Sequence, residues 1–355
     1  MATTITFGAN NRGLEVNQNN GQITIGGTSD HEIDRMCIEA LRCPNSRTVR
    51  NRLTEEKDKL SPKLVTWVLE SEEFRNWQDG EVCLLWIKGG AGKGKTMMAI
   101  SLVDHLWWLR TECSLPNRPL VSYFFCRNSD TELNSITAIL KGLIFQLVVQ
   151  DDTLMRVLRS RWNTAEREFQ FDTTSWRKLW DILWDMLDRC TSSKVYLVVD
   201  ALDECEDNAI GAFLQLIVRN GLDQPRRIKW LLTSRPLDAA ERELLPGHDQ
   251  AQVSLELNYD NVAQSVRQYV VQKVHELDRR QSYGESLRRQ IEYELVKNAE
   301  GTFLWASLVC KELDGVRKRG SSRDHPRNTS WFICSLSPGV SAAREGQQIR
   351  SERLC

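Results

Sequence analysis

The sequence predicts an α/β fold in which helices cover both faces of a parallel five-stranded sheet, with a helical subdomain after it. Five short apolar runs have the length and the β-branched content of buried strands. Stretches with helical spacing separate these runs, and strands that alternate with helices favour a parallel sheet. From Asn258 to about Arg317 the pattern is entirely helical, which indicates a separate helical subdomain.

The predicted strands are apolar along their whole length, as expected for strands that are buried on both faces. They are Val82–Ile87, Leu120–Cys126, Val195–Val199, Ile228–Leu232 and Gln252–Leu257. The predicted helices among them are Thr96–Leu109, Ile136–Val149, Trp176–Leu187, Ala209–Val218 and Ala239–Leu245. In one of these helices Trp176, Trp180 and Trp184 recur every four residues, which predicts an apolar face packed on the sheet rather than a ligand-stacking platform.

A further helix is predicted before the first strand. Ser61 is suited to cap its N-terminus, and Pro62 is suited to its first position. The residues Leu64, Val65, Val68 and Leu69 then share one face, with Trp67 and Phe74 nearby. This helix is therefore expected to pack on the rest of the domain.

Composition and periodicity together divide the chain into five parts. Residues 1–30 are rich in Asn and Gly and nearly uncharged, so they bury too little apolar surface to fold alone and are predicted to be disordered. Residues 31–80 are a helical flank, 81–257 the sheet domain and 258–318 the helical subdomain. Residues 319–355 show neither helical nor strand periodicity and are also predicted to be disordered.

The balance of charged and apolar residues argues against two kinds of partner. The 355 residues carry a net charge of -1, so no global field attracts the chain to nucleic acid or to an anionic membrane. No stretch approaches the roughly 18 uninterrupted apolar residues of a membrane helix. The ten cysteines include no Cys-x-x-Cys pair and histidine is sparse, which favours reduced thiols in a cytoplasmic protein over disulfides or a zinc site.

One segment has the pattern of a phosphate-binding loop, G-x-x-x-x-G-K-[ST]. It follows a predicted strand and opens a predicted helix, so its backbone N–H groups and the positive end of the helix dipole can converge on an anion. Lys95 is expected to reach the β- and γ-phosphates of ATP or GTP, and the Thr96 hydroxyl to bind Mg²⁺. The alternative is a glycine-rich turn that matches by chance. The predicted nucleotide-binding residues are Gly89, Gly90, Ala91, Gly92, Lys93, Gly94, Lys95 and Thr96.

A second signal is an apolar strand that ends in a carboxylate at Asp200. This arrangement is typical of the strand that holds Mg²⁺ in P-loop NTPases. Asp203 and Glu204 follow directly and are candidates for the general base that polarises the attacking water. The alternative for both is a solvated acidic loop, or the N-terminus of a helix that begins near Glu206.

A third signal is the strand that ends in Thr233, Ser234 and Arg235 before Pro236. Parallel strands present ligand contacts at their carboxyl ends, so these three side chains are expected to face the γ-phosphate. Arg235 is predicted to be catalytic, although it could instead pair with Asp203 or Glu204. The order of the motifs suits the P-loop folds whose strands are arranged 5-1-4-3-2.

With GGAGKGKT, LVVDALDEC and KWLLTSRP in this order, the chain resembles the NACHT domains of fungal STAND-type NTPases, including nephrocystin-like and heterokaryon-incompatibility proteins. The resemblance covers about residues 31–318 and includes the acidic pair Asp203 and Glu204 and the segment GTFLWASLVCKEL at 301–313. It implies the nucleotide switch of a NOD-like receptor in self/non-self recognition and programmed cell death. ATP would drive homo-oligomerisation, and hydrolysis would be slow.

Residues 3–27 are similar to the short amyloid motifs that precede such domains and template a matching segment in a cell-death effector. Asn ladders and paired β-branched residues can stack in this way. The alternative is a flexible uncharged tail.

The chain also departs from the family, whose members continue into repeats that sense a ligand. Here it ends at Cys355, and the segment after about Lys318 resembles nothing in the family, so a truncated sequence is expected. Two other functions remain open. The chain can be a plain P-loop ATPase or kinase, or a folded fragment without regulation.

Overall fold

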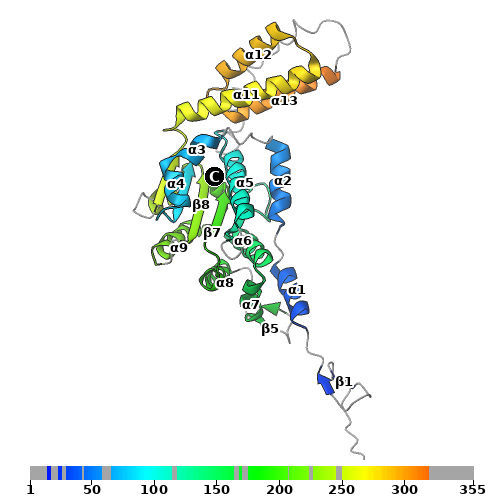
Figure 1. The fold of residues 1–355 in the computed structure, drawn as a ribbon, viewed down its shortest axis with the longest axis vertical. Coiled ribbons are helices and arrows are strands. Elements are labelled where there is room, and N and C mark those ends of the chain that lie inside the picture. Colours follow the sequence, from blue (N-terminus) through cyan, green and yellow to red (C-terminus); the bar gives the residue numbers. More distant parts are fainter. Residues whose placement is uncertain are drawn as a thin grey trace, which may run out of the picture.

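The computed structural model of the chain (Figure 1) describes most of the chain between residues 29 and 319 and two short strands before it. The described residues are 14–16, 23–25, 29–41, 44–57, 65–113, 118–163, 168–169, 175–206, 208–223, 227–244 and 250–319.

The core of the fold is a five-stranded parallel sheet in the order β4-β7-β8-β3-β9. Numbered along the chain and read from β9, this is the order 5-1-4-3-2, which confirms the predicted fold class. All five predicted strands are present, each displaced by at most a few residues at its ends. They are β3 (Leu84–Lys88), β4 (Leu120–Phe125), β7 (Val195–Asp200), β8 (Ile228–Ser234) and β9 (Gln250–Ser254).

One face of the sheet is covered by α4 (Glu72–Gln78) and α5 (Lys95–Glu112). Trp77 of α4 packs on Tyr196 of β7 with their rings 5.4 Å apart. Phe74 of α4 contacts His105 of α5 at 6.0 Å, so the two helices lie side by side. This layer places the start of α5 at the carboxyl end of β3.

The opposite face is covered by α8 (Trp176–Arg189) and α9 (Ile210–Asp223). Trp180 stacks on Trp230 of β8 at 6.1 Å and also on Trp184 at 5.7 Å, while Phe213 of α9 stands edge-on to Trp180. The tryptophan stripe is therefore an apolar packing face, as predicted. The short helix α10 (Asp238–Glu243) adjoins α9.

The β4 edge of the sheet is closed by α6 (Ile136–Gln150). The Gln146 side chain accepts from Tyr123 N at 3.3 Å and donates to Tyr123 O at 2.7 Å. One turn later, Gln150 makes the same pair of bonds to Val121, at 3.1 and 2.8 Å. Two amide side chains thus take the place of a neighbouring strand.

The amino end of the sheet holds a buried lysine, Lys229 of β8, which is only 1% exposed. Its ammonium group donates to the carbonyls of Gly80 at 2.7 Å and Val82 at 2.9 Å, in the segment that leads into β3. Trp230 N also donates to Cys83 O at 2.7 Å. These bonds fix the start of β3 against β8.

Helices also precede the sheet: α1 (Asp30–Leu41), α2 (Ser46–Lys57) and α3 (Thr66–Glu70). The predicted start at Ser61 and Pro62 lies outside the described residues. A second helix, α4 (Glu72–Gln78), follows α3 directly, because Ser71 is extended and its hydroxyl caps α4 by accepting from Phe74 N at 3.2 Å. Arg159 of α7 (Met155–Arg159) pairs with Asp30 and Asp34 of α1.

The region after the sheet is helical, as predicted. It contains α11 (Tyr259–Gln281), α12 (Glu285–Asn298) and α13 (Phe303–Arg319), drawn yellow to orange in Figure 1 beyond the carboxyl end of the sheet. Tyr269 of α11 packs edge-on against Phe303 of α13 at 5.8 Å. No helix among the described residues is long and apolar enough to cross a membrane.

The described residues also include two small strand pairs and short 3₁₀ turns. In the N-terminal segment, β1 (Leu14–Val16) and β2 (Ile23–Ile25) pair antiparallel with each other. The strands β5 (Trp162–Asn163) and β6 (Glu168–Phe169) form a second pair, and a 3₁₀ turn spans Leu202–Glu204. The other residues of the 3–27 segment, and 320–355 of the predicted tail, lie outside the described residues.

Candidate functional site

The loop Gly89–Thr96 connects β3 to α5 at the carboxyl edge of the sheet, as the motif predicts. Gly92 and Gly94 have φ angles of 74° and 87°, in the left-handed region that favours glycine. Gly94 is the N-cap of the 18-residue helix α5. The loop therefore turns the first backbone N–H groups of a long helix toward one point, which is the arrangement that binds phosphate.

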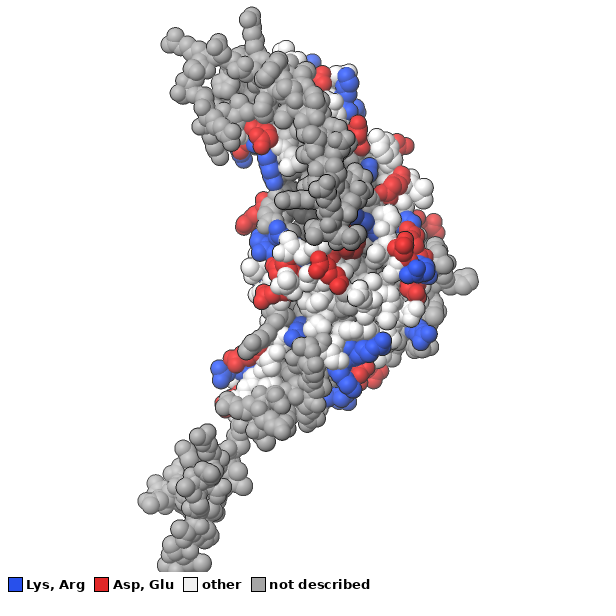
Figure 2. Space-filling model, turned by 180° about the vertical axis from the view of Figure 1, so that it is seen from behind, with Lys and Arg blue, Asp and Glu red and all other residues white. Residues whose placement is uncertain are grey.

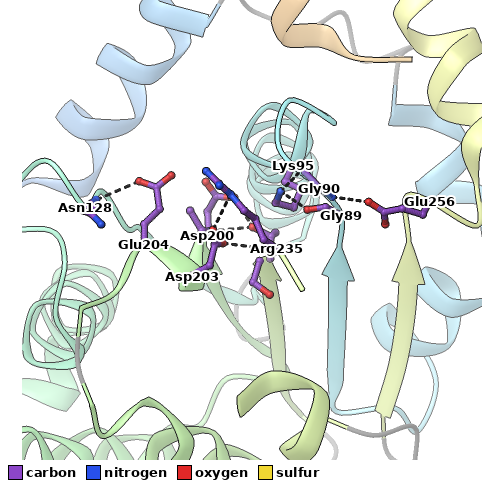
Figure 3. Close-up of polar contacts among 12 residues, drawn as sticks. Gly89, Gly90, Lys95, Asn128, Asp200, Asp203, Glu204, Arg235 and Glu256 are labelled. Carbon is purple, nitrogen blue, oxygen red and sulfur yellow. Dashed lines mark hydrogen bonds and ion pairs between the residues drawn. The ribbon is translucent and has the colours of Figure 1, made fainter. Parts of the chain in front are cut away.

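Lys95 is held against the loop that it follows. Its Nζ atom donates to the carbonyl of Gly89 at 2.6 Å and to that of Gly90 at 2.9 Å (Figure 3). Burial lowers the pKa of Lys95 below its usual value of 10.5, while the charges of Asp203 and Asp200 act in the opposite direction. The ammonium group is thus fixed at the mouth of the loop, near the acidic side chains of the next strands.

Asp200 ends β7 and is 1% exposed. Its Oδ1 atom accepts a 2.5 Å hydrogen bond from the hydroxyl of Thr233, at the end of the neighbouring strand β8. The same Thr233 oxygen accepts from Ala201 N at 3.0 Å. Thr233 therefore orients the carboxylate that the sequence assigns to Mg²⁺.

Asp203 and Arg235 are joined in the structure. Arg235 donates to the Asp203 carboxylate from its backbone N at 2.9 Å and from Nε at 3.1 Å. The Asp203 side chain is 13% exposed and that of Arg235 is 54% exposed. This is the pairing that the sequence left open as an alternative, so Arg235 reaches a γ-phosphate only if the guanidinium group turns away from Asp203.

Glu204 has a different partner. Its Oε2 atom accepts from Asn128 N at 3.2 Å, in the loop that follows β4, and Figure 3 shows the side chain turned toward that loop. Asn134 donates to Glu206 at 3.3 Å and holds the same two segments together. Glu204 therefore stands apart from the Asp203–Arg235 pair.

Ser234 differs from the prediction that it faces the γ-phosphate. It is buried, and its hydroxyl accepts a 2.9 Å hydrogen bond from the indole of Trp86 in β3. The hydroxyl therefore joins the two central strands within the sheet.

Two sets of contacts to the loop were not predicted from the sequence. Gly90 N donates to Glu256 beyond β9 at 2.5 Å. On another side, Gly92 O accepts from Phe303 N at 2.9 Å and from Leu304 N at 3.4 Å, at the start of α13. The segment that begins α13 belongs to the resemblance to NACHT domains, but nothing in the sequence shows that it touches the loop.

Lys93 adds a further link to the helical region. Its Nζ atom lies 3.4 Å from Gly301 O and 5.4 Å from the centre of the Tyr259 ring. The side chain is thus directed to the junction of α11 and α13, whereas Lys95 is directed to its own loop.

These residues fit a nucleotide with Mg²⁺. Among the described residues, no three His, Cys, Asp or Glu side chains are grouped so that they could hold a metal ion by themselves. Mg²⁺ does not require such a group, because it usually binds one or two protein oxygens, several waters and the phosphates of the substrate. Thr96, half-buried in the first turn of α5, and Asp200 are the oxygen donors that the fold offers.

Residues 63–235 match the family described as the N-terminal domain of nephrocystin 3. The chain is 33% identical to the vegetative incompatibility protein HET-E-1 of Podospora anserina over 289 residues, which are 81% of this chain. It spans 21% of the length of that relative.

Solved structures with a similar arrangement include the Walker-type ATPase paby2304 of Pyrococcus abyssi, with a TM-score of 0.47 and 14% identity over 84% of this chain and 78% of that one. PCH-2 of C. elegans matches with a TM-score of 0.42 and 11% identity over 85% and 72% of the two chains. The ORC2 protein of Aeropyrum pernix, solved with ADPNP and ADP, matches with a TM-score of 0.40 and 13% identity over 86% and 72%.

Proposed function

Since residues 63–235 match the nephrocystin 3 N-terminal family and lie in a domain that resembles a NACHT-type P-loop domain, we propose that the chain is the nucleotide switch of a signalling receptor. The observation that carries the proposal is the loop Gly89–Thr96, with Lys95 at its mouth and Asp200 at the end of a nearby strand. ATP or GTP would bind there with Mg²⁺, and hydrolysis would be slow.

Each residue has a role in this proposal. The backbone of Gly89–Thr96 and the Lys95 ammonium group hold the phosphates. Thr96 and Asp200 would hold Mg²⁺, which when bound would offset negative charge on the phosphates. Glu204 accepts a proton from the attacking water, because its carboxylate is bound by a neutral backbone N–H and not by a cation.

Asp203 and Arg235 act in support of this chemistry. Their ion pair neutralises both charges while no γ-phosphate is present. A γ-phosphate offers the guanidinium group a second anion, and the exposed side chain of Arg235 has room to turn toward it. Arg235 and Asp203 thus take part in catalysis only when a bound γ-phosphate draws the guanidinium group away from Asp203.

The contact between the loop and α13 supports a switch rather than a plain enzyme. Gly92 O accepts the first N–H groups of α13, and Lys93 reaches the junction of α11 and α13. A nucleotide that changes the conformation of the loop therefore changes the contact surface on which the helical subdomain packs. A switch needs two states that bind the nucleotide with different affinities, and this interface provides a physical difference between them.

The test is nucleotide binding by the whole chain. Wild type should bind ATP or GTP with Mg²⁺ in isothermal titration calorimetry, and Lys95→Ala should bind about 100-fold more weakly because a buried charge partner of the phosphates is lost. Lys178→Ala, which removes an exposed lysine of α8, is the matched control. Equal binding by wild type and Lys95→Ala would contradict the phosphate-site assignment.

The second candidate is a P-loop ATPase or kinase without a switch, since P-loop folds serve many chemistries. It predicts rapid turnover, or phosphate transfer to an acceptor, with no change in molecular mass. The switch predicts slow turnover and a larger mass on ATP binding in multi-angle light scattering. A constant mass with fast turnover would favour the enzyme.

We also propose that residues 3–27 act as a β-template that pairs with a matching segment of a cell-death effector. The antiparallel register of Leu14–Val16 with Ile23–Ile25 supports strand formation in this segment. Oligomerisation through 81–257 would raise the local concentration of these templates. A peptide of residues 3–27 should form β-rich fibrils, and the same peptide with Ile23→Pro should not. A wild-type peptide that stays a monomeric coil would refute this part.

The remaining assignments follow from the proposed switch. The helical flank 31–80 and the subdomain 258–318 would move relative to 81–257, and self/non-self recognition leading to cell death would be the output. The cysteines among the described residues are not joined in disulfides, which supports a reducing location such as the cytoplasm.

A further inference from the structure

The peptide unit between Gly89 and Gly90 is held from both sides. Its carbonyl oxygen accepts from the Lys95 ammonium group at 2.6 Å. Its N–H group, on Gly90, donates to the Glu256 carboxylate at 2.5 Å. Figure 3 shows Lys95 and Glu256 reaching this one peptide unit from different elements. A cation and an anion thus hold the two polar groups of a single peptide plane.

The backbone around Glu256 is built to reach this peptide. Leu255 N donates to Lys88 O at 2.9 Å, which extends the pairing of β9 with β3 by one residue. A Cβ atom on Gly89 would lie 2.9 Å from the Leu255 side chain, and one on Gly90 would lie 3.3 Å from Glu256 Oε1. The close approach therefore depends on the absence of side chains at Gly89 and Gly90.

The turn after β9 also fixes Glu256. The Ser254 hydroxyl lies 3.5 Å from Glu256 Oε2 and accepts from Leu257 N at 3.4 Å. Asn258 N donates to Ser254 O at 3.1 Å, just before α11 begins. Glu256 is exposed to solvent, but its backbone belongs to a hydrogen-bonded turn.

The geometry of a peptide unit links the two contacts. The N–H and C=O groups of a trans peptide are coplanar and point in opposite directions. A carboxylate that fixes the direction of the Gly90 N–H therefore also fixes the direction of the Gly89 carbonyl. Because that carbonyl accepts from Lys95, the carboxylate sets where the ammonium group stands. Both bonds involve an ionised group, which makes them stronger than neutral hydrogen bonds.

We propose that Glu256 is a positioning residue for Lys95, which it orients through the Gly89–Gly90 peptide so that the ammonium group faces the phosphates of a nucleoside triphosphate. The inference rests on the proposed nucleotide function. Glu256 touches neither the phosphates nor the reacting atoms in this role. Its hydrogen bond supports binding, whereas its negative charge opposes the phosphates at short range.

The two effects of Glu256 can be separated by substitution. Glu256→Ala removes the hydrogen bond and the charge, and it should weaken the binding of Mg²⁺-ATP about tenfold, the loss expected for one hydrogen bond to a charged group. Glu256→Gln keeps an oxygen acceptor and removes the charge, so its affinity should stay within about threefold of wild type or exceed it. Rescue by glutamine is a result that a merely structural role would not give.

The experiment is calorimetric titration of Mg²⁺-ATP into the full chain and these variants. Asp260→Ala removes another exposed carboxylate in the first turn of α11 and should bind as wild type does. Thermal unfolding without nucleotide should give similar midpoints for all variants, because Glu256 is exposed.

The outcomes distinguish the two proposals. If wild type binds and Glu256→Ala binds equally well, or if Glu256→Gln is as weak as Glu256→Ala, the positioning role is refuted and the nucleotide site stands. If wild type binds no nucleotide, the proposed function fails and takes this inference with it. If Glu256→Ala binds Mg²⁺-ATP more weakly than wild type and Glu256→Gln restores the affinity, the positioning role of Glu256 is supported.

Discussion

The Lys95 ammonium group stands among charges of both signs. Asp200, Asp203 and Glu256 favour its charged form, while burial, which is the largest effect, and Arg235 disfavour it. The net result is a pKa below 10.5. The balance matters because only the ammonium form binds phosphate as a cation.

A pH dependence of nucleotide binding follows. As pH rises through the lowered pKa, the unliganded Lys95 loses its proton, so affinity should begin to fall at a lower pH than it would with an ordinary lysine. Calorimetric titrations from about pH 7.5 upward check this, and Lys95→Arg is the control because a guanidinium stays protonated. A flat profile shared by both proteins would contradict the assignment of Lys95.

Glu204 and Asp203 can be told apart by their partners. Glu204→Gln should lower turnover about 100-fold and leave nucleotide affinity nearly unchanged, because it removes the proposed base. Asp203→Asn weakens an ion pair with Arg235, so its effect on turnover should be smaller. Single-turnover hydrolysis measures both. A larger loss in Asp203→Asn than in Glu204→Gln would reverse the two roles.

At the scale of elements, much of the sheet was predictable and its surroundings were not. Alternating apolar runs and helical stretches indicated all five strands, because a buried parallel strand needs apolar residues on both faces, and the order of the motifs indicated the arrangement 5-1-4-3-2. The residues of the three motifs lie at the carboxyl ends of the predicted strands or directly after them. The contacts of Glu256 and Phe303 with the loop join residues far apart in sequence, and a single chain carries no pattern for such pairs.

Two local features also could not be decided from the sequence. The break between α3 and α4 was missed because Ser71 suits a helix surface as well as a cap. The alternative partner of Arg235 could be named from the sequence, but the choice between Asp203 and a phosphate depends on distances that only the fold sets.

The seat of α13 on the loop leads to a prediction for Gly94. A Cβ atom there would lie 2.6 Å from the Phe303 ring, and the φ of 87° is unfavourable for alanine. Gly94→Ala should therefore lower the free energy of unfolding by about 2 kcal/mol. With Phe303→Ala already present, the added cost should be smaller, since the clash is gone. Denaturant unfolding of the four proteins measures the coupling.

Gly315→Ala is the matched control for this cycle. It lies within α13, and a Cβ atom there would meet nothing within 4 Å. Alanine should raise stability there by about 0.5–1 kcal/mol through helix propensity. Strict additivity of Gly94→Ala and Phe303→Ala would show that the loop and α13 are not in contact.

At the scale of the whole molecule, association between copies depends on which surfaces are open to contact. Basic and acidic side chains intermingle on the face shown in Figure 2, which gives no single charged patch for association. The β4 edge of the sheet would be a route to association if it were open, since open edges pair with other strands. Gln146 and Gln150 occupy that edge.

Loss of these two glutamines should therefore promote association. The double variant Gln146→Ala/Gln150→Ala leaves the N–H and C=O groups of Val121 and Tyr123 unpaired and should aggregate faster than wild type on mild heating. Light scattering over time measures this. Val149→Ala, at an exposed position of the same helix, should aggregate at the wild-type rate. Equal rates for all three proteins would show that α6 does not protect the edge.

The lysine buried at the amino end of β8 has a mechanical consequence. Lys229 and the Trp230–Cys83 bond anchor the entry of β3, so this strand cannot slide along its neighbour. A displacement that begins at the carboxyl end of β3 must then be taken up by the loop Gly89–Thr96 and by the start of α13, which contacts this loop. Because β3 is fixed at its start and only the loop at its end can move, a displacement of the loop shifts the first turn of α13, which is bonded to Gly92 O, and leaves the sheet in place.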